Sequence, residues 1–160
     1  MKVRDLTLDD LPAVLELEHL LFTDEAWSEE TYRGELVDRS GTRRYVAVED
    51  DGVLAGWAGL SAVAGQGDVL TIGVRPELQG RGIGSALLTA LLEEAAVRGC
   101  AEIFLDVRAD NDRARRLYER FGFTAVGVRK RYYQPSGVDA IVMMRQSRPG
   151  EAPARQGVGT

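Results

Sequence analysis

Three glycines stand at alternate positions, Gly80, Gly82 and Gly84, directly before a leucine-rich segment with helical periodicity. A glycine inside a helix costs about 1 kcal/mol relative to alanine, so three of them at one helix start need an explanation. The first turn of a helix exposes backbone N–H groups and carries a partial positive charge, and anions bind there readily. Glycines leave these N–H groups uncovered and permit positive φ. The segment therefore predicts an anion cradle; the alternative is that the glycines only allow close packing of helix on strand.

The spacing of the glycines excludes the two common nucleotide-binding motifs. A P-loop that began at Gly80 would need its second glycine at Ser85 and its lysine at Ala86. The dinucleotide fingerprint G-x-G-x-x-G would also need its last glycine at Ser85. What remains is the pattern Q-x-x-G-x-G over residues 79–84, to which Arg81 adds positive charge.

Strand-like and helical segments alternate along the rest of the chain. An N-terminal strand is followed by a helix that Thr7 is expected to cap, with Pro12 early in it, and by a second helix that Ser28 can cap. Three strands follow, with a hairpin signal at Asp51-Gly52, and then the glycine-rich helix, a strand, a short helix and two strands. This order predicts an α/β fold in which a mixed sheet carries helices on its faces.

Length and composition limit the class of protein. The 160 residues predict one domain over residues 1–146, and the aperiodic segment 147–160, rich in Gly, Pro, Ala and Arg, is predicted to be a disordered tail. The net charge of -5 argues against non-specific nucleic-acid binding. Without an apolar leader or a run of about 20 apolar residues, no membrane association is expected, and the predicted location is cytoplasmic. The single cysteine, Cys100, is interpreted as a small core residue.

In its context, the glycine segment resembles that of the GNAT acetyltransferase superfamily. The context is the strand VLTIGVRP before it and the pattern N-x-x-A-x-x-L-Y-x-x-x-G-F over residues 111–123 after it, and the resemblance covers roughly residues 2–146. It implies a GNAT fold with about seven strands and helices on both faces, acetyl-CoA as cosubstrate and no metal. The cofactor-binding residues that it implies are Ile72, Gly73, Val74, Gln79, Gly80, Arg81, Gly82, Ile83, Gly84, Ser85, Asn111 and Ala114.

The resemblance also implies a cleft beside the strand that carries residues 72–74. In the family this strand splays from the next one, and its backbone groups contact the pantetheine arm of the cofactor. Gly73 suits such a place on its own, since a glycine within a strand often marks the close approach of another backbone. A backbone N–H near Val74 is expected to polarise the thioester carbonyl.

The short helix after residue 111 carries an acid candidate. Ala114, Leu117, Tyr118 and Phe121 form one apolar stripe, which by spacing alone favours a packed Tyr118 with a satisfied hydroxyl. The resemblance implies instead that Tyr118 lies near the cofactor sulfur and protonates the leaving thiolate. Asn111 matches a family position that hydrogen-bonds the cofactor, with a plain helix cap as the alternative. The arginines 113, 115 and 116 are interpreted as a solvated face, with a contact to the cofactor's ribose phosphate as the alternative.

A base candidate comes from the strand AEIFLDVR. Its alternation places Asp106 on the face opposite Ile103, Leu105 and Val107. A carboxylate with apolar neighbours is either paired or functional, so Asp106 is the candidate for the catalytic base, and an ion pair with a nearby arginine is the alternative.

Three stretches, DEAWSEETYRGEL, LDVRADN and RKRYYQPSGVDAIVM, narrow the resemblance to the ribosomal-protein-alanine N-acetyltransferase (RimI) family. This implies direct transfer, in a ternary complex, to the N-terminal alanine of a small-subunit ribosomal protein or to another basic peptide, with Trp27 and Tyr133 binding the acceptor. Asp106 stands where the family usually has a glutamate base. Aspartate is shorter by roughly 1.5 Å, so either Asp106 acts through a bridging water, or another group serves as the base, or turnover is slow. The alternative acceptor is a lysine side chain or a small-molecule amine.

Overall fold

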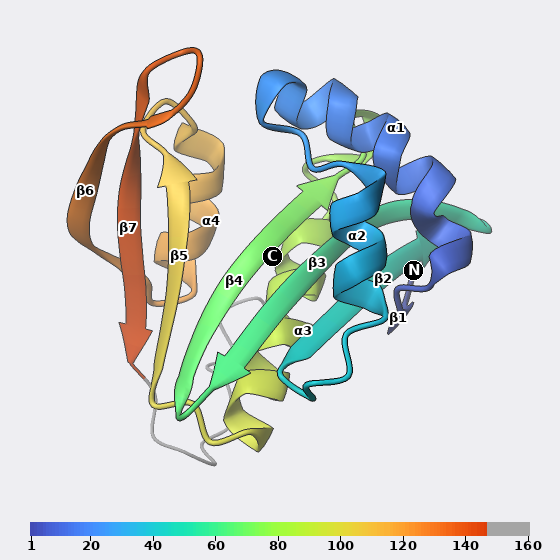
Figure 1. The fold of residues 1–160 in the computed structure, drawn as a ribbon, viewed down its shortest axis with the longest axis horizontal. Coiled ribbons are helices and arrows are strands. Elements are labelled where there is room, and N and C mark those ends of the chain that lie inside the picture. Colours follow the sequence, from blue (N-terminus) through green and yellow to red (C-terminus); the bar gives the residue numbers. More distant parts are fainter. Residues whose placement is uncertain (147–160) are drawn as a thin grey trace.

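The computed structural model describes residues 1–146, which form a seven-stranded mixed sheet in the order β1-β2-β3-β4-β5-β7-β6 (Figure 1). The tail predicted over residues 147–160 lies outside the described residues. The strands are β1 (Lys2–Asp5), β2 (Arg43–Asp50), β3 (Val53–Val63), β4 (Gln66–Val74), β5 (Glu102–Arg108), β6 (Thr124–Tyr133) and β7 (Val138–Gln146). The α-helices are α1 (Leu11–Phe22), α2 (Glu29–Leu36), α3 (Ile83–Val97) and α4 (Asp112–Arg120).

The predicted order of elements is confirmed, and most ends follow the expected local chemistry. The Ser28 hydroxyl accepts a hydrogen bond from the Thr31 N–H at the start of α2. Asp51 and Gly52 both have positive φ in the β2–β3 hairpin. Thr7 is the N-cap of the first helical turn, as expected, and the Asp10 carboxylate accepts a hydrogen bond from the Thr7 N–H at 2.9 Å. That turn, however, is a short 3-10 helix, η1 (Leu8–Asp10), and α1 begins after it. The physical reason is that Pro12 has no N–H with which to close an α-helical bond back to residue 8.

Helices cover both faces of the sheet, as the sequence predicts. In Figure 1, α1 and α2 lie in front of the sheet and α3 and α4 behind it. The front core packs side chains of α1 and α2 against Trp57 of β3. The rear core packs the leucines of α3 against the sheet, and Cys100 is buried within it. The interpretation of Cys100 as a core residue is therefore confirmed. No helix within residues 1–146 is long and apolar enough to span a membrane.

The positions of β4 and β5 determine where a ligand can enter. The two strands run parallel but pair only between Gln66–Asp68 and Glu102–Phe104. The β3–β4 ladder shifts register at Gly59/Leu60, so β4 carries one extra residue, Leu70, two positions after its last pairing with β5. Such a bulge bends a strand and increases its twist. From there β4 pairs with β3 alone and β5 pairs with β7, and Figure 1 shows the two strands diverging. The expected splay is confirmed.

Candidate active site

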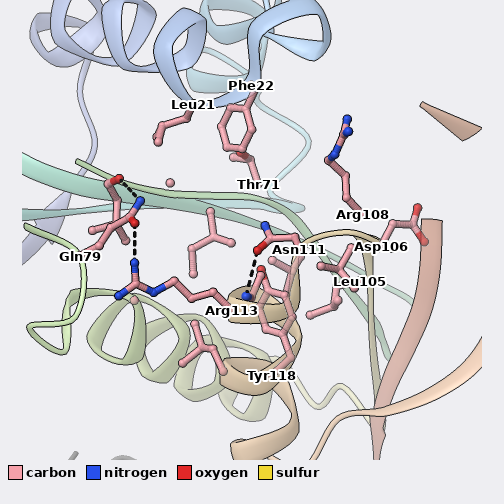
Figure 2. A pocket seen from close by; sticks show the side chains of 18 of the residues that line it. Leu21, Phe22, Thr71, Gln79, Leu105, Asp106, Arg108, Asn111, Arg113 and Tyr118 are labelled. Carbon is pink, nitrogen blue, oxygen red and sulfur yellow. Dashed lines mark hydrogen bonds between the residues drawn. The ribbon is translucent and has the colours of Figure 1, made fainter. Parts of the chain in front are cut away.

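A cavity of about 870 Å³ lies where β4 and β5 separate. Its lining comes from residues 69–74 of β4, the glycine turn before α3, residues 105–108 of β5, the start of α4, and the segment after α1 (Figure 2). Most of the predicted cofactor residues are brought together there: Ile72, Gly73, Val74, Gln79, Gly80, Gly82, Gly84, Ser85, Asn111 and Ala114. Arg81 and Ile83 are not part of the lining. Arg81 is exposed, and the Ile83 side chain is buried in the rear core.

The glycine turn has the backbone conformation that the sequence predicts. Gly80 and Gly82 have φ of 82° and 84°, in the left-handed region that favours glycine. Gly82 is also the residue before the first turn of α3, so no capping side chain covers the N–H groups of that turn. Gly84 has a different reason. A Cβ there would lie 3.2 Å from the Leu117 side chain, so this glycine serves the close packing of α4 on α3. The backbone conformation that an anion cradle needs and the close packing of the alternative are thus both present, at different glycines, and anion binding at the turn stays a prediction.

The guanidinium of Arg113 lies over the glycine turn. Arg113 of α4 donates from Nη1 to Oε1 of Gln79 at 2.7 Å, and a Cβ at Gly80 would lie 3.3 Å from its Nη2 (Figure 2). Gln79 in turn donates to the Val74 carbonyl at 3.3 Å. Helix N–H groups and a guanidinium therefore converge on one end of the cavity. That combination suits a doubly charged anion such as a pyrophosphate.

For Gly73 and Asn111, two of the predicted cofactor residues, the structure shows a role in the fold itself. A Cβ at Gly73 would lie 2.7 Å from the ring of Trp57, so the glycine leaves room for that ring. Asn111 accepts a hydrogen bond from the Ala114 N–H at 3.1 Å, which is the helix-cap alternative (Figure 2). Both residues also line the cavity, and their contact with a cofactor stays a prediction.

Tyr118 is 5% exposed and lines the cavity (Figure 2). Its ring packs edge-on against Phe123, with centroids 6.0 Å apart. Within residues 1–146, its hydroxyl takes part in no hydrogen bond, so it is not the satisfied packed tyrosine that spacing alone favours. Burial, and then the nearby Tyr133, raise the pKa of Tyr118 well above the usual range. The group therefore keeps its proton at neutral pH, which is the state an acid needs.

Asp106 also lines the cavity, and the ion pair with an arginine, which is the alternative to a base role, is present. Its Oδ1 lies 3.3 Å from Nε of Arg129, and the side chain is 28% exposed. In Figure 2 the carboxylate points away from Tyr118. A pair this open to solvent contributes little to stability, so the pairing does not explain why a carboxylate stands here. The base role stays a prediction.

The two predicted acceptor residues, Trp27 and Tyr133, come from different parts of the fold. Trp27 follows the short turn η2 (Thr23–Glu25), and its ring packs on Tyr32 with centroids 5.1 Å apart. Tyr133 ends β6, and burial followed by the charge of Asp106 raises its pKa to about 12. Both residues line the cavity, together with Asp106 and Tyr118.

Glu18 and Arg108 are among the charged residues of the cavity wall that the sequence reasoning missed. Glu18 of α1 is 1% exposed, and its Oε2 accepts from the Trp27 N–H at 3.0 Å. Its Oε1 accepts from the Tyr32 hydroxyl, and burial raises the pKa of its carboxyl group. A signal for it existed, because Glu18 stands at i+4 and i+7 from Val14 and Leu11 on the apolar stripe of α1. Arg108 at the end of β5 is the other, and it gave no comparable signal.

Residues 6–123 match the model of the acetyltransferase (GNAT) family. The chain is 44% identical over 147 residues to the N-alpha-acetyltransferase RimI of Mycobacterium tuberculosis, which covers 89% of this chain and 90% of that protein. It is 33% identical over 145 residues to the [ribosomal protein bS18]-alanine N-acetyltransferase of Escherichia coli, covering 88% and 94%. The crystal structure of the ribosomal-protein-S18-alanine N-acetyltransferase from Escherichia coli superimposes with a TM-score of 0.81 at 31% identity, covering 96% and 97%.

Proposed function

Because this chain belongs to the acetyltransferase (GNAT) family and is therefore an acetyl-CoA-dependent N-acetyltransferase, we propose that its acceptor is the N-terminal alanine of a small-subunit ribosomal protein. The observation that carries the proposal is the cavity between β4 and β5, with Gln79 and Arg113 on one side of it and Asp106 and Arg108 on the other (Figure 2). We assign the first side to the cofactor's pyrophosphate and the second to the acceptor. We propose residues 1–146 as the catalytic domain and the cytoplasm as the place of action.

The residues present fit acetyl-CoA. Past Asp68 the edge of β4 that faces β5 has no strand partner, and of its Val74 groups the carbonyl is held by Gln79. The other alternate N–H and C=O groups of residues 70–74 are free for the amides of a pantetheine arm. The left-handed turn at Gly80 and Gly82, with Arg113 over it, suits the pyrophosphate. The bound thioester supplies an activated acetyl group.

The chain's own groups divide the remaining work. The backbone N–H near Val74 polarises the thioester carbonyl. Tyr118 gives its proton to the departing thiolate, and Asp106 removes a proton from the incoming amine through a water molecule. The amine attacks the carbonyl directly, without an acyl-enzyme step.

A weak, water-relayed base suffices more readily for an N-terminal amine than for a lysine, because a larger fraction of the N-terminal amine is already neutral. With a pKa near 7.8, roughly a tenth of an α-amine is neutral at pH 7. A lysine amine with a pKa near 10.4 is neutral only about once in 2,500 molecules. A short aspartate that acts through water therefore fits the α-amine better.

A panel of acceptors tests the proposal. The purified protein is incubated with acetyl-CoA and one of three acceptors: a basic peptide that begins with alanine, the same peptide blocked at its N-terminus but containing lysine, or a small amine. We expect CoA release with the first peptide alone. Strong transfer to the small amine or to the blocked peptide, with none to the alanine-initiated peptide, would overturn the assignment in favour of the alternative acceptor.

A further inference from the structure

The segment between α1 and α2, residues 23–28, forms one wall of the acceptor end of the cavity and is held at two points. At the first point, the Glu18 carboxylate accepts a hydrogen bond from the Trp27 N–H at 3.0 Å. At the second, Arg108 at the end of β5 donates a hydrogen bond through Nη1 to Oε1 of Glu25 at 2.5 Å. The second contact joins residues 83 positions apart in the sequence and spans the region where β4 and β5 are unpaired.

The same guanidinium is fixed by two further contacts. Its Nε and Nη2 donate to the two carboxylate oxygens of Asp110 at 3.0 and 3.1 Å, in a bidentate arrangement. Its carbon lies 5.3 Å from the centre of the Tyr133 ring. One side chain therefore joins the α1–α2 segment, the turn after β5 and the end of β6. In Figure 2, Arg108 extends away from Asp106 toward the side of the cavity where α1 lies.

We propose that Arg108 is a specificity-determining residue for the acceptor. By tying Glu25 to the Tyr133 side, it bounds the acceptor opening and admits a slender, free N-terminus with a small first side chain. A bulky first residue would have to displace the guanidinium from its carboxylate and aromatic partners. The proposal rests on the proposed function, because it assumes that the acceptor is the N-terminus of a peptide.

The contact geometry favours a positioning role over a direct one. All five N–H donors of an arginine point outward from a rigid plane, and here Nε, Nη1 and Nη2 are each engaged by a carboxylate. We call Arg108 with its partners Glu25 and Asp110 the clamp. It fixes the distance between two walls of the cavity and leaves no donor nitrogen of Arg108 without a carboxylate partner. Its removal should therefore change which acceptors fit more than it changes the rate of transfer.

Two variants test the clamp from its two ends. Arg108→Met keeps most of the length of the side chain and removes the donors, while Glu25→Gln weakens the pair and leaves the contact with Tyr133. Arg33→Met is the matched control, because Arg33 pairs with Glu29 on the exposed surface of α2 and does not line the cavity. Each protein is assayed for kcat and KM with peptides that differ only in their first residue, Ala or Phe.

We expect both clamp variants to lower the kcat/KM preference for Ala over Phe by about tenfold, mainly through a lower KM for the Phe peptide. A factor of about ten lies within the discrimination that the shape of a pocket commonly provides. The double variant should lower the preference little further, since both single changes disrupt the same contact, that between Arg108 and Glu25. The control should keep the preference of the unmodified protein. Calorimetry should give the same Kd for acetyl-CoA in all variants.

The outcomes separate this proposal from the proposed function. If the unmodified protein acetylates the Ala peptide but Glu25→Gln and Arg108→Met leave the preference unchanged, the role of Arg108 is refuted alone. An equal loss of kcat/KM for both peptides would also refute it, because the clamp would then only support the fold. If the unmodified protein acetylates neither peptide, the acceptor class and this inference both fail. Should Arg108→Met not fold, Glu25→Gln decides.

Discussion

Replacing Tyr118 by phenylalanine removes one hydroxyl from the cavity and little else. That hydroxyl makes no hydrogen bond within residues 1–146, so its loss leaves no buried donor or acceptor unpaired. The ring keeps its edge contact with Phe123 at 6.0 Å. We therefore expect the free energy of unfolding to change by less than about 1 kcal/mol.

The expected effect on transfer is much larger. Loss of a general acid slows a reaction by about 100- to 10,000-fold, which corresponds to about 2.7 to 5.4 kcal/mol of transition-state stabilisation. Because burial holds the pKa of Tyr118 above its usual value of about 10, the unmodified enzyme should show no loss of rate from this group as the pH rises toward 9. The variant should lose kcat at every pH in that range by the same factor.

The assay follows release of the CoA thiol with an alanine-initiated peptide at saturating acetyl-CoA, and calorimetry gives the affinity for CoA. Tyr132→Phe is the control: it makes the same chemical change on β6, at a ring 51% exposed and outside the cavity lining. We expect it to keep full activity. An unchanged kcat in Tyr118→Phe would reject the assigned acid. A parallel loss of CoA affinity would mean that the hydroxyl positions the ligand instead.

Three further changes test other parts of the site. Gly82→Ala should weaken CoA binding by about tenfold or more, because φ of 84° costs an alanine roughly 1–2 kcal/mol and the methyl group crowds the N–H groups of α3; calorimetry that gives an unchanged Kd would contradict the cradle. Asp106→Asn should lower kcat/KM strongly with little change in thermal stability, whereas a variant that keeps full turnover would leave only the pair with Arg129. Glu18→Gln should change the pH dependence of unfolding. Because the pKa of Glu18 is raised in the folded protein, the native state still holds this proton above about pH 4.3, where the unfolded chain has lost it, so the free energy of unfolding falls as the pH rises from there to the folded-state pKa. Urea unfolding of the variant should show a smaller fall. The same slope in both proteins would refute the account of Glu18.

The sequence predicts what local rules govern and misses what distant side chains decide. The left-handed turn at Gly80 and Gly82 follows from glycine chemistry, and the divergence of β4 and β5 follows from the family resemblance. The partner of Asp106 was open, because Arg129 is brought to it by strand pairing across β7. The contact of Arg108 with Glu25 depends on the whole sheet, and no periodicity in either segment indicates it.

One feature of the sheet explains both the ligand site and the need for Arg108. Where β4 leaves β5, the edge groups of β4 lose the strand partner that a sheet interior would give them, and unpaired backbone groups cut off from water are costly. They are satisfied when the cavity is filled with water, and an extended ligand with amides of its own can replace that water as an added strand would. The same divergence removes the hydrogen-bonded connection between the α1–α2 side and the β6–β7 side at the acceptor end. A side chain that bridges them there, as Arg108 does, restores a defined width without closing the edge that the ligand uses.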